Sequence, residues 1–112
     1  METKRQKRKN CKIYMKVFND KTGDLVGFLV NLTTEGLMLS SDGPIETDTV
    51  FNLRVILPEE IKGNKEVTVS AKSKWCDQDE PPLHNTGFQL QDVEKKDIRI
   101  IERIMKKFCF KD

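Results

Sequence analysis

Residues 86–108, TGFQLQDVEKKDIRIIERIMKKF, contain the change of pattern that decides the fold. Up to Leu90 the stretch reads as a short strand, in which apolar and polar residues alternate. From Asp92 onward the apolar residues recur at helical spacing, and charged residues occupy most of the other positions. The sequence therefore predicts a last strand at 86–90 that is followed directly by an amphipathic helix at 92–108.

The predicted helix carries one apolar stripe, which consists of Ile98, Ile101, Ile104, Met105 and Phe108. Asp92 is a suitable N-cap, and Glu94 lies in the first turn, where the helix dipole favours an acid. An amphipathic helix of this kind must cover an apolar surface. We therefore expect it to pack on the rest of the domain.

Upstream of the helix the pattern has a period of two and is interrupted by turn residues. The expected strands cover residues 11–18, 25–32, 36–40, 50–57, 67–75 and 86–90. In the long fifth strand, one face is expected to carry Val67, Val69, Ala71 and Trp75, with Ser73 as a polar exception. This order predicts a mainly β fold, a small six- or seven-stranded antiparallel β-barrel that the C-terminal helix closes or plugs.

The chain has 112 residues, which allows one domain, and its 37% hydrophobic and 34% charged residues fit a soluble globular protein. We expect a flexible basic arm at 1–10 and the barrel domain with its helix at 11–112. No apolar run approaches the roughly 18 residues of a membrane span, and no secretory signal is recognisable. The widely spaced Cys11, Cys76 and Cys109 form neither a disulfide framework nor a zinc pattern, which favours a cytoplasmic location.

Charge is distributed unevenly along the chain. Between Met1 and Lys16 there are seven Lys or Arg residues and one acid, although the net charge of the chain is only +2. A basic arm on a near-neutral body favours a focused anion site over a general nucleic-acid coat. A solvated tail without a ligand is the competing interpretation.

The segment Asn31-Leu32-Thr33-Thr34-Glu35-Gly36 joins two of the expected strands. Short polar side chains followed by Gly suit a tight loop whose backbone approaches a ligand closely, and Gly36 is expected to adopt a positive φ. Together with the basic cluster at 4–9, the segment predicts a site for a phosphorylated, nucleotide-like ligand. A plain turn without a ligand remains an alternative.

The order of these features resembles the PilZ domain, the bacterial receptor module for cyclic di-GMP. That family carries an RxxxR element before its first strand, a [D/N]xSxxG element between its second and third strands, and a terminal strand followed by an amphipathic helix. Residues 31–36 are similar to the second element, with Thr33 supplying the hydroxyl, and Gly87-Phe88-Gln89-Leu90 resembles the terminal strand. Lys74-Trp75 resembles the end of a strand that often carries Trp.

The basic cluster carries a variant of the RxxxR element. If Arg8 is the second Arg, then Lys4 occupies the first position and Arg5 stands beside it. If Arg5 is the first Arg, then Lys9 fills the second position. Strand alternation favours the Arg8 register, because it places the apolar residues of the first strand where the family has inward ones. In either register a Lys replaces an Arg, which keeps the charge but loses the planar fork.

The resemblance implies a cyclic di-GMP site made of Lys4, Arg5, Arg8, Lys9, Asn31, Thr33, Gly36 and Trp75. Guanidinium groups suit both the phosphates and the guanine O6/N7 edges of this ligand, while Asn and Thr offer amide and hydroxyl groups. For Trp75, packing in the barrel is the alternative to stacking on a base.

The implied function is a cytoplasmic, non-enzymatic receptor or adaptor that signals when its arm closes on cyclic di-GMP. The resemblance further implies an unidentified protein effector and a role in regulating motility or biofilm formation, with no cofactor, metal, membrane, DNA or RNA. The lone His84 has no catalytic partner in the sequence. Two alternatives stay open: a degenerate PilZ-like module that binds protein and no nucleotide, and a basic barrel for single-stranded nucleic acid. The near-neutral body and the lack of an aromatic row argue against the latter.

Overall fold

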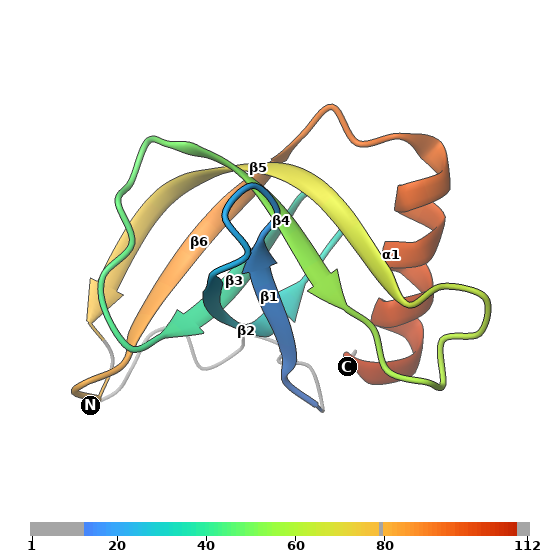
Figure 1. Ribbon diagram of the computed structural model, residues 1–112, viewed down its shortest axis with the longest axis horizontal. Helices are drawn as coiled ribbons and strands as arrows, with labels where there is room; N and C mark the ends of the chain where they lie inside the picture. Colours follow the sequence, from blue (N-terminus) through green and yellow to red (C-terminus); the bar gives the residue numbers. More distant parts are fainter. Residues whose placement is uncertain (1–12, 79, 110–112) are drawn as a thin grey trace.

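The structure is a computed structural model that describes residues 13–78 and 80–109. Within these ranges the chain forms six strands followed by one helix (Figure 1). The elements are β1 (Met15–Asn19), β2 (Leu25–Leu32), β3 (Gly36–Ser41), β4 (Val50–Ile56), β5 (Glu66–Gln78), β6 (His84–Gln91) and α1 (Lys95–Phe108).

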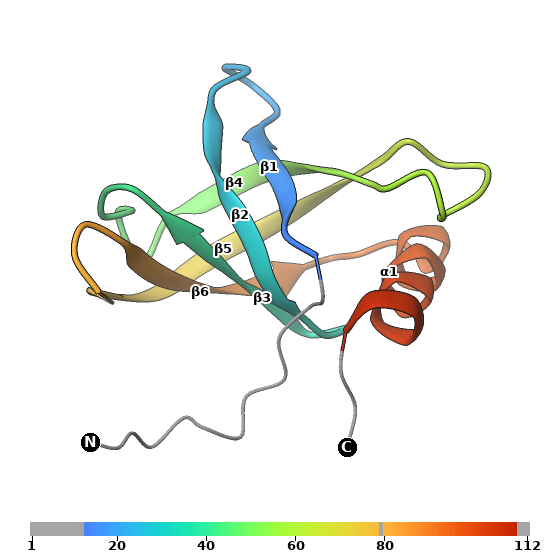
Figure 2. The ribbon, with the colours of Figure 1, turned by 90° about the horizontal axis from the view of Figure 1, so that it is seen from below.

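The strands close into a barrel in the order β1-β2-β3-β6-β5-β4, and each neighbouring pair is antiparallel. The long strand β5 joins two parts of this barrel. Its residues 66–72 pair with β4, and its residues 70–78 pair with β6. Figure 2 shows the resulting strongly twisted sheet with α1 at one end. The predicted mainly β barrel with a C-terminal helix is therefore confirmed, with six strands.

The barrel interior and the helix share one hydrophobic core. Leu29, Leu39 and Leu53 are completely buried inside the barrel. The helix adds four buried side chains to the same cluster, Ile100, Ile101, Ile104 and Phe108. Full burial of such a side chain is worth about 1.5–3 kcal/mol relative to exposure. The helix thus acts as a lid on one end of the barrel.

The apolar stripe of the helix differs from the predicted one at a single border. Ile100 is buried, whereas Ile98 is only half-buried and Met105 packs against the core from its edge. Ile98 and Ile100 lie on opposite borders of the stripe, and the border with Ile100 is the buried one. Ile100 lines a pocket together with Val67 and Val69 of β5. The sequence pattern alone does not fix which border is buried.

The predicted helix start was wrong by three residues, because α1 begins at Lys95 with Glu94 at the N-cap position. Asp92 is not the cap, since its φ of 47° places it in the left-handed region. Asp tolerates this conformation, which turns the chain out of β6 before the helix begins. Asp97 is the acid in the first helical turn.

The hairpin of β5 and β6 is longer than predicted. The ladder extends through Asp77 and Asn85 to the pair Gln78–His84, whereas the predicted strands ended at residue 75 and began at residue 86. β1 is shorter than predicted and begins at Met15. Cys11 and Lys12, the first residues of the expected strand, lie outside the described residues.

Candidate functional site

A pocket of about 200 Å³ lies on the outer face of the barrel, across β2, β3, β6 and β5. Its lining residues are Asn31, Thr33, Gly36, Leu37, Met38, Lys74, Trp75, Gly87 and Phe88. Four of the predicted site residues are thus brought together: Asn31 from the end of β2, Thr33 from the following turn, Gly36 from the start of β3 and Trp75 from β5. The other four, Lys4, Arg5, Arg8 and Lys9, lie outside the described residues.

A β-bulge in β2 brings Asn31 to this face. Leu29 pairs with Leu39 and Asn31 pairs with Met38, so Val30 is the extra residue. In a regular strand Leu29 and Asn31 would point to the same side, because side chains alternate with a period of two. The bulge breaks this alternation, so that Leu29 stays in the core while Asn31 faces outward.

A second bulge, in β5, acts on Trp75 in the same way. Ser73 pairs with Phe88 and Trp75 pairs with Gly87, which leaves Lys74 as the extra residue. Ser73 is buried on the inner face, but Trp75 is half-buried on the outer one. The prediction that Trp75 continues the inward face of Val67 was therefore wrong, since an inserted residue shifts every later side chain to the other side.

The two bulges align a row of residues across four strands. Asn31 pairs with Met38, Met38 with Gly87, and Gly87 with Trp75. A Cβ on Gly87 would collide with the indole of Trp75, so the ring lies directly against this glycine. Met38 is 5% exposed and yet lies outside the interior core cluster, since it forms the floor of the pocket. Three strand spacings separate Asn31 from Trp75, roughly 14 Å in all.

The turn at 31–36 is held by its own side chains. The hydroxyl oxygen of Thr33 accepts hydrogen bonds from the backbone N–H groups of Glu35 and Gly36, both at 3.2 Å. The backbone N–H of Thr33 donates to the carbonyl of Gly36 at 2.9 Å. The Asn31 Oδ1 accepts from the N–H of Leu32 at 2.8 Å. Both polar side chains thus shape the turn, as the plain-turn alternative requires.

Gly36 is required at its position for a different reason from the predicted one. Among the described glycines, positive φ angles occur at Gly23 and Gly63, and Gly36 is not among them. A Cβ on Gly36 would lie 2.5 Å from the carbonyl oxygen of Phe88 on the neighbouring strand. The expectation of positive φ was wrong, and the glycine is instead required by close packing against β6. The close approach of this backbone to a ligand stays a prediction.

The charge of the pocket favours an anion. Lys74 is exposed and is the charged residue among the described lining residues, which include no acid. Sequence reasoning did not identify Met38 as part of the site, because its place depends on cross-strand register. The alternating pattern of β3 predicts that Met38 faces outward, but only the pairing with Gly87 places it beside Trp75.

Metal-ligating side chains are not clustered in residues 13–78 and 80–109. Within these ranges no group of three or more His, Cys, Asp or Glu residues could hold a metal ion. Among the described residues, Cys76 and Cys109 are not joined in a disulfide. Within the described residues, α1 is not long and apolar enough to span a membrane.

Comparison with solved structures finds a similar fold in a longer chain. A structure described as Bacillus subtilis Inhibitor of motility (MotI/DgrA) matches with a TM-score of 0.67 and 14% sequence identity. The match covers 96% of this chain and 54% of the other, so this chain spans about half the length of that protein. At this identity the likeness shows the fold. No curated protein matches the sequence.

Comparison with protein families gives a match over nearly the whole chain. The family described as PilZ domain matches residues 2–107. The matched range includes the basic cluster, the turn at 31–36, all six strands and most of α1. PilZ domains are binding and adaptor modules, and the ligand of the family is cyclic di-GMP. This chain belongs to the PilZ domain family.

Proposed function

We propose that this protein is a cytoplasmic receptor module that binds cyclic di-GMP on the outer face of the barrel and signals when its N-terminal arm closes on the ligand. The observation that carries this proposal is the convergence of Asn31, Thr33, Gly36 and Trp75 on one pocket, whose described lining residues include no acid. Membership of the PilZ family supports the choice of ligand.

The chemistry of the pocket suits one half of such a ligand. The half-buried indole of Trp75 offers a flat apolar face for a guanine, and Lys74 beside it offers a cation for phosphate. Because Asn31 and Trp75 stand roughly 14 Å apart across three strand spacings, a ligand with two bases has room to contact both ends of the row. Thr33 and Gly36 act by holding the turn in shape.

The arm supplies the remaining positive charge in this proposal. Lys4, Arg5 and Arg8 would contact the phosphates and a guanine edge, because guanidinium groups form paired hydrogen bonds with both. Ordering of a basic segment over the ligand would couple binding to a change in shape that an effector can recognise. No step of this mechanism requires catalysis.

Motility control is the output that we favour. The solved structure with the similar fold is described as an inhibitor of motility. That description belongs to a longer protein, and it supports a signalling role for this chain through a protein effector. The wide, irregular spacing of the three cysteines supports the cytoplasmic location.

A second function is favoured by the hydrogen bonds of the turn. The acceptor oxygens of Asn31 and Thr33 are already used by backbone N–H groups, as in a turn that needs no ligand. In addition, one Arg of the RxxxR element is replaced by Lys in either register. These two observations fit a PilZ-like module that binds a protein and no nucleotide.

Calorimetric titration of the full chain with cyclic di-GMP, with GTP as the control, decides between the two functions. The receptor function predicts saturable heat with cyclic di-GMP alone and a higher melting temperature in its presence. Absence of both signals at millimolar ligand, with no rescue by Lys4→Arg, would leave the protein-interaction module as the function.

A further inference from the structure

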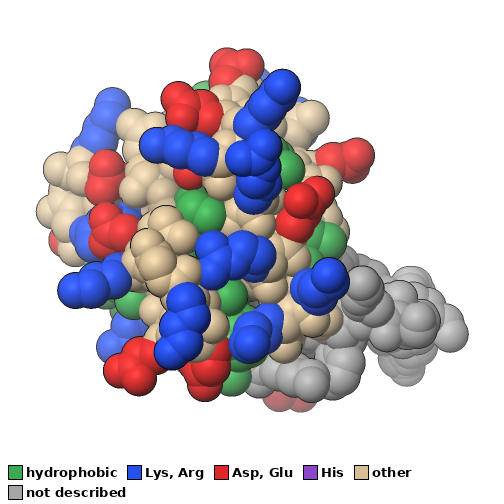
Figure 3. Space-filling model, turned by 90° about the vertical axis from the view of Figure 1, so that its right-hand side faces the viewer, with side chains coloured by type: hydrophobic (Ala, Val, Ile, Leu, Met, Phe, Trp, Pro, Cys, Tyr) green, Lys and Arg blue, Asp and Glu red, His purple; other side chains and the backbone are tan. Residues whose placement is uncertain are grey.

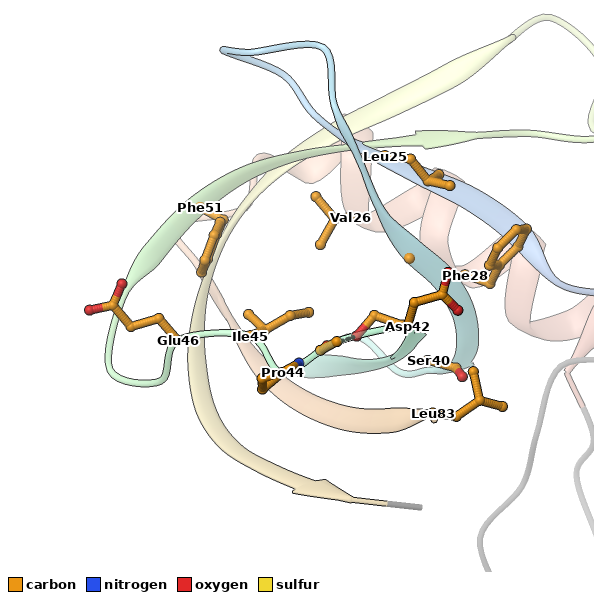
Figure 4. A pocket seen from close by; sticks show the side chains of 13 residues that line it. Leu25, Val26, Phe28, Ser40, Asp42, Pro44, Ile45, Glu46, Phe51 and Leu83 are labelled. Atoms are coloured by element: carbon orange, nitrogen blue, oxygen red, sulfur yellow. Dashed lines mark hydrogen bonds between the residues drawn. The ribbon is translucent and has the colours of Figure 1, made fainter. Parts of the chain in front are cut away.

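Another pocket in the described structure lies at the end of the barrel away from α1. It has a volume of about 540 Å³, and it is formed by the start of β2, the end of β3, the loop at 42–46, Phe51 of β4 and Leu83. Figure 4 shows Val26, Ile45 and Phe51 pointing into the hollow from different segments. These three side chains are only half-buried, although they pack against the core.

Exposed apolar side chains are concentrated around this hollow. Leu25 is 49% exposed, Phe28 37% and Leu83 37%, and all three line it. They make up half of the six large hydrophobic residues that are exposed among the described ones. A concentration of this kind on a soluble domain marks a surface that a partner covers.

The charges at the hollow have one sign. Among its described lining residues, Asp42 and Glu46 are the charged ones, and both are exposed acids. Neither carboxylate forms an ion pair within the described residues. In contrast, Figure 3 shows that the α1 end carries Lys, Arg, Asp and Glu side chains side by side.

We propose that this hollow is a docking site for an effector protein, and that the docked segment carries an apolar anchor side chain flanked by Lys or Arg. The volume falls within the range of about 300–1,000 Å³ that is usual for binding pockets, and it admits an aromatic or branched anchor. Cations beside the anchor would complement Asp42 and Glu46. The proposal does not depend on nucleotide binding, since none of the hollow's lining residues belongs to the pocket at Trp75.

The test uses the full chain without nucleotide and two synthetic peptide libraries. In the first library a central Trp, Phe, Leu or Ile is flanked by Lys and Arg. In the second library Glu replaces each Lys and Arg. We expect basic members to bind at least about tenfold more tightly than their acidic counterparts. Amide chemical-shift changes should centre on residues 25–28, 40–46 and 83.

Matched variants then locate the binding surface. Phe28→Ser and Leu83→Ser should each lower the affinity for the tightest-binding peptide by about tenfold, because the apolar anchor of the peptide loses a contact. Val50→Ser is the control, since Val50 is 58% exposed and does not line the hollow. Asp42→Lys should weaken binding by about fivefold and should shift the preference toward acidic peptides. Melting temperatures verify that each variant is folded.

Several results would overturn the proposal. One is that no basic peptide binds. Another is that the amide chemical-shift changes lie away from the hollow. A third is that Val50→Ser weakens binding as much as Leu83→Ser. Tight binding of a peptide made of residues 1–12 would identify the chain's own arm as the occupant instead. Self-association that Leu83→Ser abolishes would identify a second copy.

Discussion

The two ends of the barrel differ in how their apolar side chains are covered. At one end α1 places Ile101 and Ile104 on the interior, so that the apolar core is sealed by the chain itself. At the other end Val26, Ile45 and Phe51 remain half-buried around an open hollow, and exposed apolar side chains surround it. The sealed end therefore contributes stability, whereas the open end keeps apolar surface available for recognition.

The largest loss of stability is expected when a side chain of α1 that fills the core is truncated. Ile104→Ala removes a completely buried side chain and should lower the free energy of unfolding by about 2–5 kcal/mol. Leu25→Ala, at the open end, is the matched control and should change it by less than about 0.5 kcal/mol, because Leu25 is exposed. Urea denaturation measures both. Equal losses would show that the open end also carries stability.

The next largest effect is expected on the affinity for cyclic di-GMP, whose proposed site lies on the outer face of the barrel, between its two ends. Arg8→Ala should weaken cyclic di-GMP binding by about 1.5–3 kcal/mol, because a charge-assisted bond is lost that no Lys reproduces. Lys4→Arg should strengthen binding if the Arg8 register is correct, and Lys9→Arg only if the other register is correct. Calorimetry on the two Lys variants thus decides the register. Binding should also weaken with salt, as expected for phosphate contacts.

These outcomes bear on what the sequence predicts and what it does not. The strands of the barrel, the helix and the turn at 31–36 can be predicted from the sequence, because the spacing of apolar residues and the position of turn residues reflect the local backbone conformation. The orientation of Asn31 and Trp75 does not follow, because each depends on one inserted residue, Val30 or Lys74, that shows itself only in the cross-strand register. The sequence also gives no sign of the open hollow, since its described lining residues come from four segments that are far apart in the chain, 25–28, 40–46, 51 and 83.

Gly36 at the start of β3 and Gly43 in the loop after β3 provide a smaller comparison. Gly36→Ala places a Cβ 2.5 Å from the backbone oxygen of Phe88, which cannot move away without disturbing the sheet. We expect a loss of about 1–3 kcal/mol in stability. At Gly43, beside the hollow, an added Cβ would have nothing within 4 Å, so Gly43→Ala should be neutral or slightly stabilising. A tolerated Gly36→Ala, judged by urea denaturation, would contradict the tight backbone contact.

The smallest expected effect tests whether the pocket at Trp75 and the open hollow are coupled. Phe51 lines the hollow, and its ring meets that of Phe88 edge to face at 5.8 Å between centroids. Phe88 also lines the pocket at Trp75, so this ring pair is a direct side-chain link between the two. Phe51→Leu keeps an apolar side chain but removes the ring contact, which is worth about 0.5–1.5 kcal/mol.

If the ring pair transmits binding, Phe51→Leu should change the affinity for cyclic di-GMP by about two- to threefold, although it does not touch that pocket. By thermodynamic reciprocity, cyclic di-GMP should change the affinity of the best basic peptide in the wild-type chain, and this change should shrink in Phe51→Leu. Val26→Ala is the control, because it shortens an apolar side chain of the same hollow and leaves the ring contact between Phe51 and Phe88 in place. Peptide titrations with and without nucleotide measure the effect. An unchanged nucleotide effect in Phe51→Leu would mean that the open end and the outer face act independently.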